Sequence, residues 1–147
     1  MMRAPMIALT ALVVAGAAFA HTGVKNAAVK ARMDAMSAIG AEMKTLGQMA
    51  KGAAAFDRDK ARSAVAAIAR HAAETPALFE AREDDPKSEA KAEIWDAFAD
   101  FTAKSGSLEA LALELSASIA TEGDLAPAMK SLGATCQACH KAYREEK

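Results

Sequence analysis

The stretch Cys136-Gln137-Ala138-Cys139-His140 stands close to the C-terminus of the 147-residue chain. It reads CxxCH, which is the attachment sequence of a c-type haem. In a helix, cysteines three apart lie on one face with Cβ atoms about 5 to 6 Å apart, so both thiols can bond one porphyrin. His140 follows directly and can offer a ring nitrogen to the iron. The stretch therefore predicts a helix that holds one covalent haem c through Cys136 and Cys139, with His140 as an iron ligand.

Other uses of a CxxC pair are weighed against haem. A structural zinc site needs four ligands, and this chain has 2 cysteines in all. A thioredoxin-like redox pair belongs in a βαβ setting, whereas a plain disulfide or two free thiols would suit an exported protein. The histidine that directly follows the second cysteine favours haem over these alternatives.

The segment around the motif has the pattern of a buried helix. Apolar residues recur three and four apart from Leu125 to Tyr143, and both motif cysteines fall on this stripe. Gly123 predicts the end of the preceding helix and Asp124 the cap of this one, with Pro127 tolerated in the first turn. A haem tethered to the buried stripe would enter the core between helices, where bundles hold their cofactors.

Three more helices are predicted upstream. Residues 24–51 lack proline and show apolar spacing of three and four. A second such helix, capped by Asp57 or Asp59, runs to about Thr75, where Pro76 ends it. A third helix begins between residues 88 and 96 and continues through Gly106, because the apolar stripe keeps its register there. Alanine dominates the apolar content, while β-branched and aromatic residues are few. The sequence predicts an all-α, antiparallel four-helix bundle without strands.

Two residues on the apolar stripe of the first helix invite a functional interpretation. Arg32 would be a buried cation in need of a partner, and haem propionates are candidates; alternatively, it lies near the bundle end and extends its charged group to water. Met36 shares this helix with Met33, Met43 and Met49. A methionine stripe is usually core filling, yet a thioether is also a known sixth ligand of haem iron. Spacing alone leaves both interpretations open.

The N-terminus has the pattern of a secretory signal peptide. Residues 1–20 combine Arg3, an apolar run from Met6 to Val14, and an A-x-A cleavage site at Ala18-Phe19-Ala20. The apolar run is short for a membrane span. We therefore expect a haem domain over residues 21–147 in the periplasm, with no membrane span after cleavage.

Chain length and net charge limit the number of domains and the classes of binding partner. The chain that remains after removal of the signal peptide is long enough for one compact domain with a hydrophobic core. The chain holds 18 basic and 19 acidic residues, so no basic excess points to nucleic acid. We expect no nucleic-acid partner.

Taken together, these features resemble the class II cytochromes c, the cytochrome c′ family, in which CxxCH stands on the last helix of a bundle. The resemblance rests on Cys136 to Arg144, on Glu93 to Phe101 and, more weakly, on Ala28 to Met36. It covers nearly all of the expected haem domain. One departure is Ala31, because relatives often have an aromatic residue there.

The resemblance implies roles for further residues. In this family the residue four after the first-helix arginine faces the iron: an apolar residue leaves it five-coordinate and open to small gases, whereas a methionine is the sixth ligand in the low-spin branch. Met36 holds that position, and Met33 and Met43 are the fallback ligands. The resemblance also places Arg144 near His140, where its charge would tune the iron. Alternatively, Arg144 is a solvated cation at a helix C-terminus.

We expect a one-electron carrier and no enzyme. Its redox partner proteins would bind transiently, steered by lysines near the haem edge such as Lys25, Lys30, Lys130 and Lys141. A second copy of the chain, in a homodimer, is a further candidate partner. The first alternative is a five-coordinate cytochrome c′-like protein that binds nitric oxide or carbon monoxide. The second is a thiol redox protein or disulfide-stapled bundle without haem.

Overall fold

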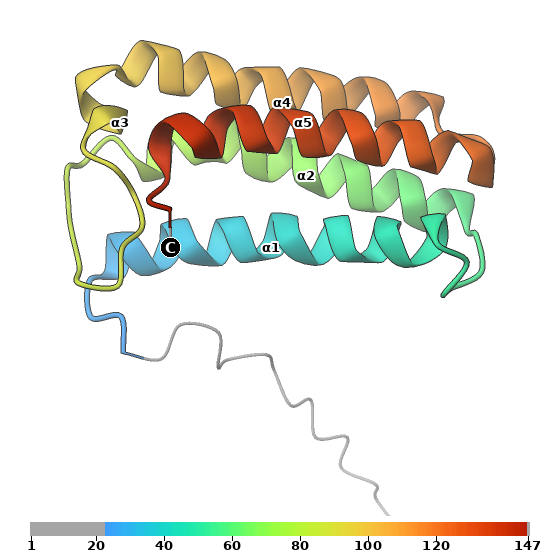
Figure 1. The fold of residues 1–147 in the computed structure, drawn as a ribbon, viewed down its shortest axis with the longest axis horizontal. Coiled ribbons are helices and arrows are strands. Elements are labelled where there is room, and N and C mark those ends of the chain that lie inside the picture. The colour runs from blue at the N-terminus through green and yellow to red at the C-terminus, as the bar shows by residue number, and fades with distance from the viewer. Residues whose placement is uncertain (1–22, 147) are drawn as a thin grey trace, which may run out of the picture.

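Four long helices form an antiparallel bundle in a computed structural model that describes residues 23–146 (Figure 1). The predicted all-α bundle is confirmed, and the described residues include no β-strand. The predicted signal peptide, residues 1–20, lies outside the described part of the chain. Within residues 23–146 no helix is long and apolar enough to cross a membrane. The elements in chain order are α1 (Ala27–Ala50), α2 (Arg58–Leu78), α3 (Glu93–Asp96), α4 (Phe98–Ser118), the 3-10 helix η1 (Glu122–Asp124) and α5 (Leu125–Tyr143).

The first two long helices begin at side-chain caps. The Asn26 side chain accepts a 3.0 Å hydrogen bond from the N–H of Val29, and the Asp57 carboxylate accepts one of 2.9 Å from the N–H of Lys60. Each bond satisfies a backbone donor that the first helical turn leaves free. The caps place the start of α1 three residues later than the apolar pattern predicted, and they show that Asp57, one of the two predicted caps, begins α2.

Pro76 does not end the second helix, so that prediction is wrong. The helix continues to Leu78, although a proline at position 76 leaves the carbonyl of Ala72 without its helical N–H partner. Ser105 of α4 supplies a replacement, because its buried hydroxyl donates a 2.7 Å hydrogen bond to that carbonyl. The neighbouring helix therefore stabilises a conformation that the local sequence disfavours.

The second half of the bundle differs from the prediction at two junctions. The predicted third helix is split at Ala97, whose φ of −128° and ψ of 44° are not helical, but it does run unbroken through Gly106. Asp124 does not cap α5 with its side chain, and Gly123 lies within η1. Instead, the Asp124 carboxylate accepts the N–H groups of Ala120 and Thr121 at 3.0 and 2.8 Å, which fixes the turn between α4 and α5.

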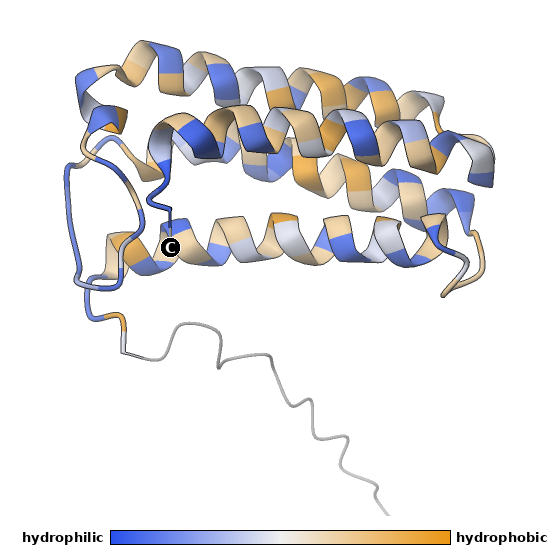
Figure 2. Cartoon of the chain, in the orientation of Figure 1, coloured by the Kyte–Doolittle hydropathy of each residue, from blue (hydrophilic) through white to orange (hydrophobic). Residues whose placement is uncertain are grey.

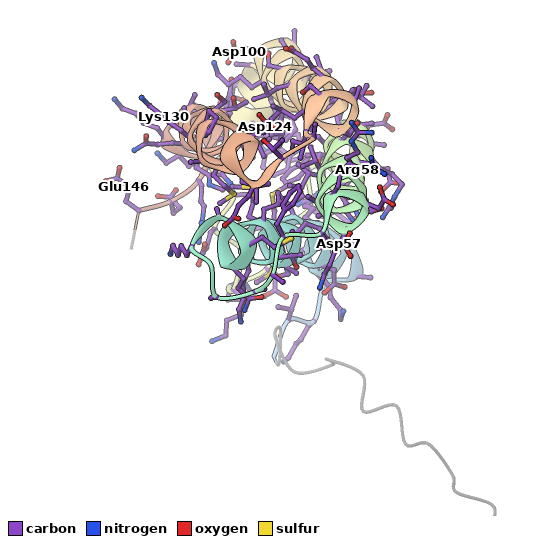
Figure 3. All side chains as sticks on the ribbon, turned by 90° about the vertical axis from the view of Figure 1, so that its right-hand side faces the viewer. Asp57, Arg58, Asp100, Asp124, Lys130 and Glu146 are labelled. Atoms are coloured by element: carbon purple, nitrogen blue, oxygen red, sulfur yellow. The ribbon has the colours of Figure 1, made fainter. Side chains whose placement is uncertain are left out.

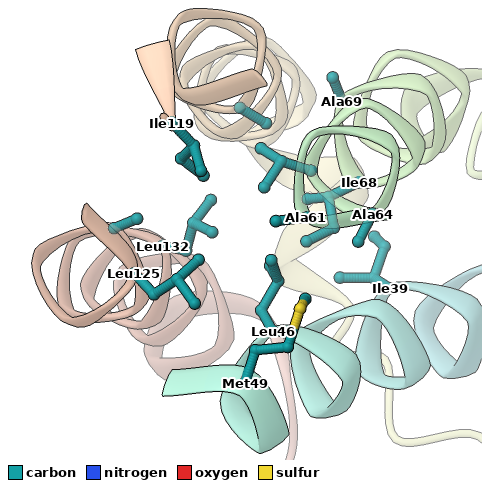
Figure 4. Close-up of a cluster of buried hydrophobic side chains, with 13 residues drawn as sticks. Ile39, Leu46, Met49, Ala61, Ala64, Ile68, Ala69, Ile119, Leu125 and Leu132 are labelled. Atoms are coloured by element: carbon teal, nitrogen blue, oxygen red, sulfur yellow. The ribbon is translucent and has the colours of Figure 1, made fainter. Parts of the chain in front are cut away.

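Hydrophobic and hydrophilic residues alternate along the long helices (Figure 2), and the buried apolar residues gather in two clusters. The main cluster fills the half of the bundle where α1 ends and α5 begins (Figure 4). The end cluster lies near the C-terminus of α5 and consists of Phe79, Ile94, Phe101 and Tyr143. On α5 the last residue of the main cluster is Leu132, so the motif cysteines lie between the two clusters. The main cluster contains Ile39, Leu46, Met49, Ala61, Ala64, Val65, Ile68, Ala69, Ala112, Ile119, Leu125, Ala128 and Leu132.

Candidate functional site

The CxxCH motif occupies the last turns of α5, as predicted. Cys136 and Cys139 are half-buried, while His140 is more exposed. The apolar stripe of α5 is fully buried at Leu132 and again at Tyr143, but not at the two cysteines between them. Burial raises the pKa of both thiols, as expected for side chains against an apolar surface. Between Leu132 and Tyr143, other side chains of the bundle therefore cover the apolar stripe of α5 only in part.

Helix α1 faces this part of α5 with a defined register. A Cβ placed on Gly47 would lie 3.6 Å from Cε of Met129, so the antiparallel helices touch there. Met36 lies eleven residues before Gly47, and His140 lies eleven residues after Met129. Eleven helical residues span about 16 Å in either helix. Met36 and His140 therefore lie at the same height to within about one helical turn.

Between the contact at Gly47 and the level of His140, each of the two helices carries a glycine with open space beside it. A Cβ added at Gly40 of α1 or at Gly133 of α5 would meet no atom within 4 Å. Gly40 is one turn from Met36, and Gly133 is one turn from Cys136. The residues fit a haem: thiols for its attachment, an imidazole for its iron, and open space beside both helices.

The methionines of α1 separate into different environments. Met49 is buried in the main cluster and Met43 packs against it. Met33 is half-buried, and Met36 is one of the exposed large apolar residues, with 36% of its surface accessible. An apolar side chain at the level of His140 that the protein covers only in part is the one left to meet a cofactor.

Charges near His140 favour its neutral form. Burial of part of the ring lowers the pKa of His140, the positive charge of Arg144 lowers it further, and Glu89 acts in the opposite direction. A neutral imidazole has the free lone pair that ligation requires. The predicted proximity of Arg144 to His140 agrees with this electrostatic effect and with a 2.9 Å bond from the Arg144 N–H to the His140 carbonyl.

Arg32 is buried, so the alternative that its charged group reaches water is wrong. The residue is 3% exposed. Its guanidinium donates to three backbone carbonyls of the segment after α2, and it lies over the rings of Phe79 and Trp95, at 4.7 and 5.3 Å from their centroids. Two of its five N–H groups remain for another acceptor. The carbonyl acceptors are those of Leu78 at 2.9 Å, Ala81 at 2.6 Å and Glu83 at 2.8 Å.

Residues 80–87, which follow α2, have the charged composition typical of a surface loop, and nothing in the sequence indicates the structural role that this segment has. Asp85 is buried, and its Oδ2 accepts the N–H groups of Lys25 and Asn26 at 2.8 and 3.0 Å. These bonds hold the pKa of Asp85 below its usual value; the largest contribution comes from the Lys87 N–H within the loop. The loop is thereby fixed to the start of α1. A cluster of acidic residues after a helix gave no signal that one of them would be buried.

Comparisons with known proteins agree with the fold and the site. A model of the cytochrome c′ family matches residues 27–144. A cytochrome c-556 of Agrobacterium tumefaciens is 37% identical over 120 residues, covering 81% of this chain and 98% of that protein. A cytochrome c′ of Rhodospirillum rubrum is 38% identical over 144 residues, covering 92% and 97%. The solved cytochrome c′ from Rhodopseudomonas palustris superposes with a TM-score of 0.77 at 27% identity, covering 84% of this chain and 99% of its own.

An all-α bundle with CxxCH on its last helix defines a class II cytochrome c, and the chain belongs to the cytochrome c′ family. It is a haem protein with one haem c attached through Cys136 and Cys139. When bound, haem c supplies an iron that can change between Fe(III) and Fe(II). The bundle supplies the attachment, the space and the charges around it.

Proposed function

We propose that this protein is a periplasmic one-electron carrier whose iron is bound by His140 and Met36. The observation that carries the proposal is the position of Met36, which lies at the level of His140 on the facing helix and is partly exposed. Its neighbours Met43 and Met49 are engaged in packing, which favours Met36 over Met43 as the sulfur ligand.

Ligands on two packed helices suit electron transfer. Gly47 and Met129 fix the distance between α1 and α5 on one side of the proposed site, and the end cluster lies on the other. His140 and Met36 would then keep their places in both oxidation states, so little would rearrange when the charge changes. A methionine ligand also raises the reduction potential relative to a second nitrogen ligand.

The lysines around the site differ in their freedom to steer a partner. Lys30 is paired with Asp34 at 2.5 Å, whereas Lys130 and Lys141 of α5 make no ion pair within residues 23–146. Helix α5 contains no acidic residue, and Lys130 projects outward from the bundle (Figure 3). We therefore expect a redox partner that presents an acidic surface and binds transiently.

A second candidate is a gas-binding protein with five-coordinate iron. Gly40 leaves open space next to Met36, so the thioether has room to turn away from the iron and leave a site for nitric oxide or carbon monoxide. Both kinds of name, cytochrome c-556 and cytochrome c′, occur among the relatives.

Absorption spectra of the haem-loaded protein separate the two candidates. The ferric and ferrous forms are recorded with and without carbon monoxide, for the wild type and for Met36→Leu, with Met33→Leu as the matched control. The carrier proposal expects a low-spin spectrum with a sulfur-to-iron charge-transfer band that Met36→Leu removes and Met33→Leu keeps. A high-spin spectrum that responds to carbon monoxide in the wild type would instead support gas binding.

A further inference from the structure

The chain that follows His140 is tied to a segment far away in the sequence. Residues 89–91 pair antiparallel with residues 143–145, with a β-bridge between Ala90 and Arg144. The N–H of Lys91 donates to the carbonyl of Tyr143 at 3.0 Å, and the N–H of Glu145 donates to that of Glu89 at 2.8 Å. This pairing fixes the backbone within one helical turn of the haem ligand.

Side chains add an ion pair to this backbone clamp. Nε and Nη2 of Arg144 both lie 2.7 Å from Oε2 of Glu89. The Glu89 side chain is 22% exposed and that of Arg144 53%, so water screens the pair only in part. Because the backbone of each partner is fixed by the β-bridge, the two charges are held at a set place relative to His140.

The ion pair lies close to the His140 ring. Arg144 follows His140 by one helical turn and its N–H donates a 2.9 Å hydrogen bond to the His140 carbonyl, so the paired charges of Arg144 and Glu89 lie near the side chain that would bind the iron. A positive charge near the iron disfavours Fe(III), which carries one more positive charge than Fe(II). A negative charge beside it offsets that effect.

We propose that Glu89 is a positioning residue that holds and neutralises Arg144, and that this ion pair sets the reduction potential of the iron bound by His140. The proposal depends on haem ligation by His140. It depends neither on Met36 as a ligand nor on electron carriage, so it can fail or hold separately from the proposed function.

The test is a double-mutant cycle on the haem-loaded protein at low ionic strength, read as the reduction potential in a spectroelectrochemical titration. Glu89→Gln keeps an oxygen acceptor for Arg144 and removes the charge, and Arg144→Gln removes the opposite charge. Glu122→Gln is the matched control, because Glu122 precedes α5 and lies more than about 25 Å along the helix from His140.

Glu89→Gln is expected to shift the Fe(III)/Fe(II) equilibrium about threefold to tenfold toward Fe(II), which is about 28 to 59 mV upward for one electron. Arg144→Gln should shift it downward by a similar factor, and the double variant should return to within about twofold of the wild type. Both shifts should shrink as salt is added.

Two results would overturn the proposal. One is a potential in Glu89→Gln that differs from the wild type no more than that of Glu122→Gln does. The other is a shift of both single variants in the same direction, which would mean that a loosened end of α5 and not the charge is responsible. Should Glu89→Gln yield no haem-loaded protein, Arg144→Gln must still lower the potential and Glu89→Asp must leave it nearly unchanged.

Discussion

The hydroxyl of Tyr143 donates a 2.5 Å hydrogen bond to the carboxylate of Asp100, joining the last turn of α5 to the first turn of α4. This bond raises the pKa of Tyr143 to about 12 and lowers the pKa of Asp100. Because the pKa of Asp100 is lower in the folded protein than in the unfolded chain, the bond stabilises the fold at pH values above the unfolded pKa. This stabilisation is lost as the pH falls through the folded pKa. Because the pKa of Tyr143 is higher in the folded protein, the same bond stabilises the fold at pH values below the unfolded pKa of tyrosine, near 10. This stabilisation is lost as the pH rises through the folded pKa of about 12.

We expect Tyr143→Phe to be less stable than the wild type at pH 7. The difference should shrink between pH 10 and pH 12, and again in acid below pH 4, because the wild type loses the same bond there. Denaturant unfolding across this pH range measures the difference. A constant difference at every pH would assign the loss to packing in the end cluster and not to the bond with Asp100.

Removing the hydroxyl of Ser105 should destabilise the bundle, because the carbonyl of Ala72 would then be buried without a donor. We expect Ser105→Ala to lower the free energy of unfolding by about 1 to 3 kcal/mol. Ser107→Ala is the control: its exposed hydroxyl donates to the carbonyl of Ala103 within the same helix, and its loss should cost less than about 0.5 kcal/mol. Adding Pro76→Ala, which restores an N–H in α2, should recover part of the loss in Ser105→Ala but not in Ser107→Ala.

Loss of Arg32 should release the segment after α2. Arg82, an exposed residue within this segment, offers a cleavage site for trypsin. We expect cleavage after Arg82 to be about tenfold faster in Arg32→Gln than in the wild type, since the hydrogen bonds to the backbone carbonyls are lost. Arg70→Gln, on the exposed face of α2, should leave the rate unchanged. Unchanged cleavage in Arg32→Gln together with an altered haem potential would favour the predicted propionate contact over a role in holding the loop.

A large side chain at Gly133 should compete with the haem for space. We expect Gly133→Leu to reduce the amount of covalently bound haem per chain several-fold, because the added atoms would enter the open space between α1 and α5. Gly106→Leu carries the same change in helix propensity at a position that also has nothing within 4 Å but is an exposed residue of α4. Mass spectrometry counts the attached haem. A full complement of haem with an unaltered spectrum in Gly133→Leu would place the cofactor elsewhere.

Charge reversal on α5 should change the reactions of the reduced protein with small oxidants. We expect Lys130→Glu and Lys141→Glu to slow oxidation by the hexacyanoferrate(III) anion and to speed oxidation by a cationic cobalt complex, both by about twofold to tenfold at low salt. The effect should fade as ionic strength rises. Lys60→Glu, on the first turn of α2, is the control. Equal rates in all three variants would show that electrons leave by a face other than α5.

The features of this protein that have local causes follow from its sequence alone. CxxCH works through residues three and four apart in one helix, and the apolar stripes have the same period, so the motif, the four long helices and the haem attachment could all be predicted. Proline also disfavours a helix for a local reason, but Pro76 does not end the helix here. A hydroxyl 29 residues further along the chain, that of Ser105, compensates for the missing N–H.

Only the tertiary structure decided which distant groups meet. Buried polar and charged groups are stabilised by whatever donors and acceptors the fold brings near, and sequence separation carries no information about that. Arg32 therefore finds carbonyls after α2, Asp85 finds the start of α1, and Arg144 finds Glu89. The level of Met36 relative to His140 is likewise set by the contact of α1 with α5, because helical periodicity fixes a residue's face but not its height against a neighbouring helix.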